Sequence, residues 1–238
     1  MKIQFDIRLI LLFSLFFFSS ISAQNEKINE ILIKSLNAHG GENLNKIKKI
    51  KYLKTTFTYD DLGNLKKEIK QIITHKFNPY KTEIESNNKT LKSDGIITEI
   101  LENGEIVKDF KSLNKAKSKI NGAFYVFWQP MKLKDAGTII KYMGVSTLPN
   151  KKRVFSLEVS YRDGTDTWNF YFDTNSYLLV GTEVNHNNKV SLIYTTDFNR
   201  TESGVFHHKR ESYIVSENRS KLRIQASYVY DILDVVKK

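Results

Sequence analysis

The chain has 238 residues and a formal net charge of +11, from 37 Lys and Arg residues against 26 Asp and Glu residues, and it contains no cysteine. The absence of cysteine excludes disulfide bonds, thiolate metal sites, cysteine nucleophiles and lipid attachment at a processed N-terminal cysteine. The basic balance favours anionic partners such as phospholipid headgroups, although abundant lysine throughout the chain also fits compositional bias. Nucleic acid is not expected as a partner, because no nucleic-acid-binding motif is present.

The first 23 residues have the pattern of a secretory signal peptide. Lys2 and Arg8 precede the apolar run Leu9–Phe18, and mostly small residues follow up to Ala23. The run is shorter than the roughly 20 apolar residues of a membrane-spanning helix. We therefore expect cleavage after Ala23. The remaining residues, 24–238, are expected to form one domain that is exported to the periplasm as a soluble monomer without a lipid anchor.

An amphipathic helix is predicted over residues 26–39. Its apolar residues recur at helical spacing on one face, namely Ile28, Ile31, Leu32 and Leu36. The stretch ends with His39, Gly40 and Gly41. A histidine near the last carbonyls, followed by two glycines, is typical of a structural helix C-cap. The alternative is that His39 is a ligand or proton carrier.

From Ile50 onward the pattern predicts antiparallel strands joined by polar turns. They are expected over residues 50–59, 65–77, 80–86, 90–101 and 106–110, and then over 138–142, 154–161, 166–173, 178–185, 189–198, 207–216 and 221–232. Strands with one apolar face favour a single strongly curved antiparallel sheet, or open β-barrel. We therefore predict a mainly β fold with a few helices (α+β), in which an N-terminal helix and a central helix cover the sheet.

The densest aromatic stretch beyond the N-terminus is Gly122–Leu133, GAFYVFWQPMKL. It is predicted to be a short helix that ends before Pro130, preceded by a solvated basic link over Lys111–Lys119. A helix that fills an incompletely closed sheet is both core and cavity lining. We expect ligand contacts from this stretch and from a facing strand, namely Phe124, Phe127, Trp128, Met131, Trp168 and Phe170.

Catalytic and metal-binding motifs are missing from the sequence. It has no zinc-protease, calcium-loop or nucleophile-elbow pattern. His207 and His208 are adjacent in a predicted strand, so their side chains should point to opposite faces rather than to one metal ion. We therefore expect no metal, no cofactor and no enzymatic activity, with a hydrolase as the less favoured alternative.

Two stretches carry a resemblance to a known group. The order of a signal peptide and a helix ending Ala38-His39-Gly40-Gly41, together with the strand–turn–strand stretch Trp168–Val180, resembles exported Gram-negative proteins of unknown function. These are grouped loosely with the outer-membrane lipoprotein-sorting (LolA/LolB-like) proteins. The resemblance implies an open β-barrel covered by helices, with an apolar cavity for acyl chains.

Two functions follow as hypotheses. The first is an exported, non-enzymatic binding protein that holds a hydrophobic ligand, a lipid or a lipoprotein acyl chain, between the curved sheet and a helix. The alternative is an envelope structural or interaction module. Its basic surface would then meet anionic lipid or a protein partner through Lys46, Lys48, Lys49, Lys51, Lys111, Lys115, Lys117 and Lys119.

Overall fold

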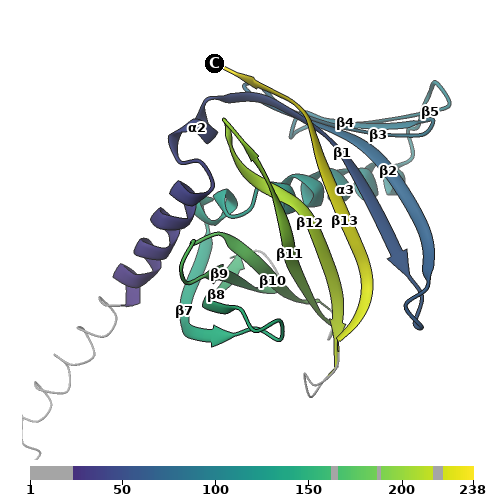
Figure 1. Cartoon of the computed structure of the whole chain (residues 1–238). Coiled ribbons are helices and arrows are strands. Elements are labelled where there is room, and N and C mark those ends of the chain that lie inside the picture. Colours follow the sequence, from purple (N-terminus) through teal and green to yellow (C-terminus); the bar gives the residue numbers. More distant parts are fainter. Residues whose placement is uncertain (1–23, 162–165, 187–188, 217–221) are drawn as a thin grey trace, which may run out of the picture.

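A computed structural model describes residues 24–161, 166–186, 189–216 and 222–238 of the chain. These residues form one sheet of 13 strands in the order β6-β5-β4-β3-β2-β1-β13-β12-β11-β10-β9-β8-β7 (Figure 1). Every neighbouring pair is antiparallel. The expectation of a mainly β fold built on a single antiparallel sheet is confirmed. The predicted signal peptide lies outside the described residues.

One half of the sheet is a meander that begins at the centre and ends at an edge. Its strands are β1 (Ile47–Tyr59), β2 (Leu65–Phe77), β3 (Tyr80–Ser86), β4 (Lys89–Ser93), β5 (Thr98–Glu102) and β6 (Glu105–Ile106). The Asn103-Gly104 pair forms the last hairpin, because both residues adopt the positive φ that such a tight turn needs.

The other half starts at the opposite edge and returns to the centre. Its strands are β7 (Thr138–Thr147), β8 (Arg153–Tyr161), β9 (Thr167–Asp173), β10 (Leu179–His186), β11 (Lys189–Thr201), β12 (Gly204–Val215) and β13 (Leu222–Lys237). Strand β13 pairs with β1 from Ile47 opposite Lys237 to Thr58 opposite Ala226. The first and last strands therefore join the two halves.

Two strand predictions are wrong. Residues 90–101 form two strands rather than one, because the Asp94 carboxylate accepts the backbone N–H groups of Ile96 and Ile97 at 2.9 and 2.8 Å and closes a turn between them. Residues 106–110 are not a strand either. Strand β6 ends at Ile106, and Asp109 already caps the next helix.

The predicted basic link over Lys111–Lys119 is also wrong, since it is the first half of helix α3 (Phe110–Phe127). Asp109 begins the helix by accepting the backbone N–H of Ser112 at 2.8 Å. The helix buries Ala116, Ile120 and Phe127 against the sheet, while the lysines between them face solvent. After Trp128 the chain makes a short 3-10 helix, η1 (Met131–Lys134).

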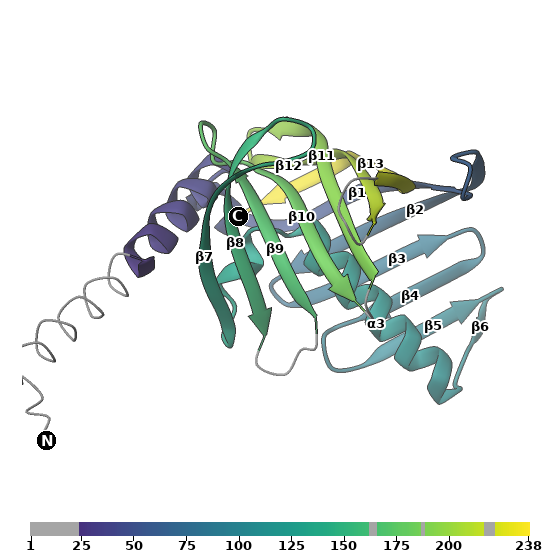
Figure 2. The same ribbon diagram turned by 90° about the horizontal axis from the view of Figure 1, so that it is seen from below.

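Helix α3 and the N-terminal helix pack against one face of the curved sheet (Figure 2). Helix α3 begins beside β5 and β6, contacts β3, β4 and β5, and extends toward β8 and β9. The N-terminal helix, residues 24–38, packs Ile28 and Ile31 against strands β8 to β10, and α2 (Glu42–Asn45) follows it. None of the described helices is long and apolar enough to span a bilayer.

Candidate functional site

The His-Gly-Gly stretch ends the N-terminal helix and docks it onto the sheet. The imidazole of His39 is buried, and its Nδ1 donates a hydrogen bond to the Ser35 carbonyl at 2.8 Å. The His39 carbonyl accepts the backbone N–H of Val205, at the start of β12, at 2.9 Å. Burial lowers the pKa of His39 to about 4, so the imidazole is neutral at pH 7.

A pocket lies beside this turn, between the end of the N-terminal helix, α2 and the segment after α3. It has a volume of about 370 Å³. Its walls combine leucine, tryptophan and methionine side chains with a rim of amides, one carboxylate and one lysine. The lining residues are Leu36, Asn37, Gly41, Glu42, Leu44, Asn45, Trp128, Met131 and Lys134. The structure thus brings together Trp128 and Met131 from the predicted contacts.

Trp128 forms the aromatic wall of this pocket, and two other aromatic rings pack against its indole. Its ring centroid lies 4.6 Å from that of Phe77 and 6.1 Å from that of Phe206. These rings belong to β2 and β12, so side chains of two strands pack against the indole. The wall is therefore a preorganised surface.

Phe124 and Phe127 do not line the pocket. Phe127 is 1% exposed, and its ring stacks on Tyr52 with a centroid distance of 4.1 Å. Phe124 turns toward β2 and β3, where its ring centroid lies 5.1 Å from that of His75 and 5.2 Å from that of Tyr80. Phe127 therefore packs in the core between α3 and the sheet, whereas Phe124 is half-buried beside β2 and β3.

Trp168 and Phe170 lie on β9, on the helix-covered face, and are likewise absent from the pocket lining. Phe170 is fully buried with the N-terminal helix. Trp168 contacts Tyr125 of α3 at a centroid distance of 5.4 Å, and the Tyr125 hydroxyl is 2.7 Å from that of Tyr161. The Gly122–Leu133 segment does contact β9, but through Tyr125, which was not among the predicted contact residues.

A buried polar network lies beneath Phe124. His75 Nε2 is 3.1 Å from the Tyr52 hydroxyl, and His75 Nδ1 is 2.8 Å from Thr82 Oγ1. Both ring nitrogens thus have hydrogen-bond partners. Burial lowers the pKa of His75 to about 3, so the network is held by a neutral imidazole.

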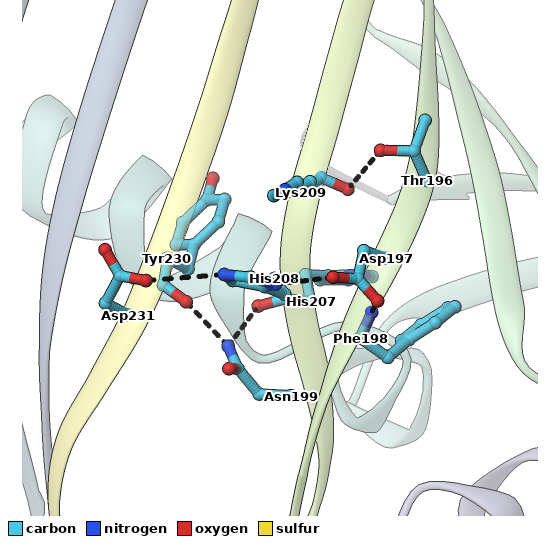
Figure 3. Close-up of polar contacts among 9 residues, drawn as sticks. All are labelled: Thr196, Asp197, Phe198, Asn199, His207, His208, Lys209, Tyr230 and Asp231. Carbon is cyan, nitrogen blue, oxygen red and sulfur yellow. Dashed lines mark hydrogen bonds and ion pairs between the residues drawn. The ribbon is translucent and has the colours of Figure 1, made fainter.

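His207 and His208 point to different surroundings (Figure 3). His207 is buried, with Nδ1 2.9 Å from Thr195 Oγ1. His208 lies between two carboxylates, with Nδ1 2.6 Å from Asp197 and Nε2 3.3 Å from Asp231. It therefore links β11, β12 and β13. The described residues contain no group of three or more His, Asp or Glu side chains arranged to hold a metal ion.

A second hollow lies on the face of the sheet that the helices leave uncovered. It has a volume of about 650 Å³ and crosses strands β7 to β13. The lining mixes apolar and polar side chains, from Met143, Ser146, Thr147, Leu148, Pro149, Ser156, Asn169, Tyr171, Glu183, Leu192, Val215 and Leu222. None of the predicted contact residues belongs to it.

Comparisons with known proteins place this fold. The model of a family described as "Family of unknown function (DUF6503)" matches residues 7–217, whereas a comparison with curated proteins gave no significant match. The fold is similar to that of a DUF1329 family protein from Desulfovibrio piger, with 6% identity over 88% of this chain and 92% of that one and a TM-score of 0.52. That likeness is one of fold alone.

Two further structures align over a similar share of the chain. A LolA superfamily protein from Nitrosomonas europaea has 8% identity, covering 88% of this chain and 93% of that one, with a TM-score of 0.45. Lipoprotein LppX from Mycobacterium tuberculosis has 8% identity, covering 87% and 93%, with a TM-score of 0.30. The predicted resemblance to a group of unknown function is confirmed by the family match.

Proposed function

This chain belongs to DUF6503, a family of unknown function, and we propose that it binds an apolar ligand in the pocket beside Trp128. The observation that carries the proposal is the pocket itself, where Trp128 and Met131 face Leu36 and Leu44 across a space of about 370 Å³. That volume lies within the range of pockets that hold small ligands, about 300 to 1,000 Å³.

The chemistry of the lining favours a chain-like ligand with one polar end. Apolar side chains supply the walls, where each buried methylene contributes about 0.8 kcal/mol. Glu42, Asn45 and Lys134 contribute polar groups to the lining, and these can contact water or a polar headgroup. A lipid or a lipoprotein acyl chain fits this combination. No catalytic assembly is needed for such a function, and we propose a non-enzymatic carrier or receptor.

The place of action belongs to the same proposal. A charged start, an apolar run and small residues up to Ala23 favour export to the periplasm. There an apolar ligand would be a lipid or the acyl chain of a lipoprotein. We also propose that the protein acts as a monomer.

Tryptophan fluorescence tests the proposal directly. The chain has two tryptophans, so the Trp168→Phe variant leaves Trp128 as the only reporter. Octanol and decanol should shift the Trp128 emission, and each added methylene should tighten binding about fourfold until the pocket is full. Met131→Ala should weaken binding.

The matched control is Met143→Ala, because Met143 lines the other hollow. It should leave the affinity for decanol unchanged. If Met143→Ala weakens binding and Met131→Ala does not, the ligand occupies the uncovered face and the assignment to Trp128 is wrong. An emission spectrum that no alcohol changes would refute the proposal as a whole.

A second candidate function rests on the surface of α3. The helix carries four lysines and no acidic residue, and Phe110 at its start is 79% exposed. Lysines beside an exposed aromatic ring suit an anionic membrane surface. Binding to anionic vesicles that weakens with salt and with Phe110→Ala would favour this function over the pocket. Binding that is indifferent to salt would count against it.

A further inference from the structure

A polar row runs across the covered face of the sheet, set by the register of its central strands. Gln71 of β2 pairs with Lys54 of β1, and Lys54 pairs with Tyr230 of β13. Two residues earlier on β13, Tyr228 pairs with Arg210 of β12. The row therefore places an amide, an ammonium group, two phenols and a guanidinium side by side.

Arg210 is the most unusual member of this row. It is 1% exposed, and one guanidinium nitrogen donates to Thr182 Oγ1 at 3.2 Å, while Nε has no hydrogen-bond partner in the described part of the chain. No ion pair is found for it among the described residues. A buried charge without a counter-charge costs several kcal/mol of stability. Such a residue is expected where an anion completes its surroundings.

Farther along the row, on β1 and β2, Lys54 and Gln71 are also donors without a matching acceptor. Gln71 is 7% exposed, and its amide nitrogen has no partner in the described residues. The ammonium group of Lys54 lies 5.0 Å from the Tyr228 ring centroid and 5.6 Å from that of Tyr230, and no carboxylate pairs with it in the described chain. Unpaired N–H donors along one row of a covered face favour an oxyanion.

Helix α3 contributes one more cation, Lys119. Partial burial, together with the smaller effect of the Lys54 and Lys89 charges, lowers the pKa of Lys119, so these ammonium groups are close enough to repel one another. Lys119 is exposed and Lys54 is half-buried, whereas Gln71 and Arg210 are buried. The row thus leads from the surface into the interior, and an anion would enter from the lysine end.

We propose that Lys54, Gln71 and Arg210 form a binding site for an oxyanion, a carboxylate or phosphate group. This site goes beyond the pocket beside Trp128. The ring of Phe127 lies between them, with its centroid 6.4 Å from that of Trp128 and 6.0 Å from that of Tyr230. The two sites can therefore be tested separately.

Thermal unfolding in the presence of three probes tests the site and its ligand. Inorganic phosphate represents a free oxyanion, decanoate an oxyanion on an apolar chain, and decanol the same chain without charge. A rise in Tm with phosphate that is lost in the Arg210→Met variant assigns a free oxyanion, because phosphate also stabilises folded proteins non-specifically. A rise with decanoate that exceeds the rise with decanol, without a response to phosphate, assigns an anionic lipid. If neither anion exceeds decanol, the proposal is overturned, whatever decanol itself shows about the Trp128 pocket.

Variants separate binding from structure. Arg210→Met removes the unpaired charge, so it should raise Tm in anion-free buffer and abolish the response to the anion. Arg200→Met, at an exposed position on β11, should change neither. Lys54→Met, at a half-buried position, should weaken anion binding about tenfold even if Arg210→Met fails to fold. An unchanged anion response in Lys54→Met would contradict the assignment.

Discussion

Gly40 and Gly204 approach each other so closely that a Cβ atom on Gly40 would lie 2.8 Å from the Cα of Gly204. A Cβ atom on Gly204 would lie 2.6 Å from the His39 carbonyl oxygen and 2.8 Å from a methyl carbon of Leu44. Real Cβ atoms do not approach backbone atoms this closely. The His-Gly-Gly stretch is therefore built for direct contact between the helix end and the first residue of β12.

This contact predicts the effect of adding one methyl group. Gly204→Ala should lower the free energy of unfolding by about 2 kcal/mol or more, because the backbone must move apart to admit the Cβ atom. Gly122→Ala is the matched control. A Cβ atom there meets nothing within 4 Å in the middle of α3, so this change should stabilise by about 0.5 to 1 kcal/mol. Urea unfolding of both variants checks the pair, and equal effects would contradict the prediction.

Acid sensitivity follows from the buried histidines. The folded protein holds the pKa of His39 near 4 and that of His75 near 3, and burial lowers that of His207 well below its usual value. Between pH 6.5 and 4 the unfolded chain therefore binds more protons than the folded chain. The free energy of unfolding should fall as the pH falls, by up to about 1.4 kcal/mol per pH unit for each histidine.

Urea unfolding at pH 7, 6, 5 and 4.5 measures this slope. His75→Gln should make it shallower, since one of the buried imidazoles is gone. A free energy of unfolding that stays constant down to pH 4.5 would show that the imidazoles are protonated inside the fold, contrary to the expectation.

Two phenylalanines of α3 should differ sharply in their contribution to stability. Phe127 is 1% exposed and stacks on Tyr52, whereas Phe110 is 79% exposed. Phe127→Ala should cost about 3 to 5 kcal/mol through the cavity that it leaves, and Phe110→Ala should stay within about 0.5 kcal/mol of the unchanged protein. Thermal unfolding compares them, and a small effect of Phe127→Ala would argue that α3 is not anchored at this end.

Asn199 should contribute to the stability of the fold through its contacts from β11 to β12 and β13. Its amide nitrogen donates to the His207 carbonyl at 3.2 Å and to the Tyr230 carbonyl at 2.6 Å (Figure 3). Asn199→Ala should cost about 1 to 3 kcal/mol, because two backbone carbonyls lose their donor. Asn114→Ala, at an exposed position on α3, should have no such cost. A free energy of unfolding that Asn199→Ala leaves unchanged would show that water replaces the amide.

Local sequence patterns predicted most of the sheet, and the failures have local causes. The limits of β2 and β3 were predicted to the residue, since Asp60–Asn64 and Pro79 mark their ends clearly. The start of α3 was missed because its four lysines dominate the sequence there. Only Leu113, Ala116 and Ile120 show the helical spacing of apolar residues. Asp94-Gly95 was a turn signal within the stretch predicted as one strand.

The candidate sites were harder to predict. Trp128 and Met131 stood out by composition, yet their partners Leu36 and Leu44 come from the N-terminal helix and α2, almost a hundred residues earlier. The polar row could not be predicted at all. Gln71 and Arg210 share a face only through the register of β2, β1, β13 and β12, and sequence patterns leave such long-range register open.

The position of β13 constrains the order in which the molecule can be assembled. Strands β1 to β6 and β7 to β12 each follow one another closely in the sequence, so both halves can pair as soon as they are synthesised. The two halves can join only when β13 pairs with β1, which brings residues 47 and 237 together. Contacts between such distant residues slow folding, because a long loop must close first. A growing chain would therefore hold two unfinished sheets with open edges until its last strand arrives.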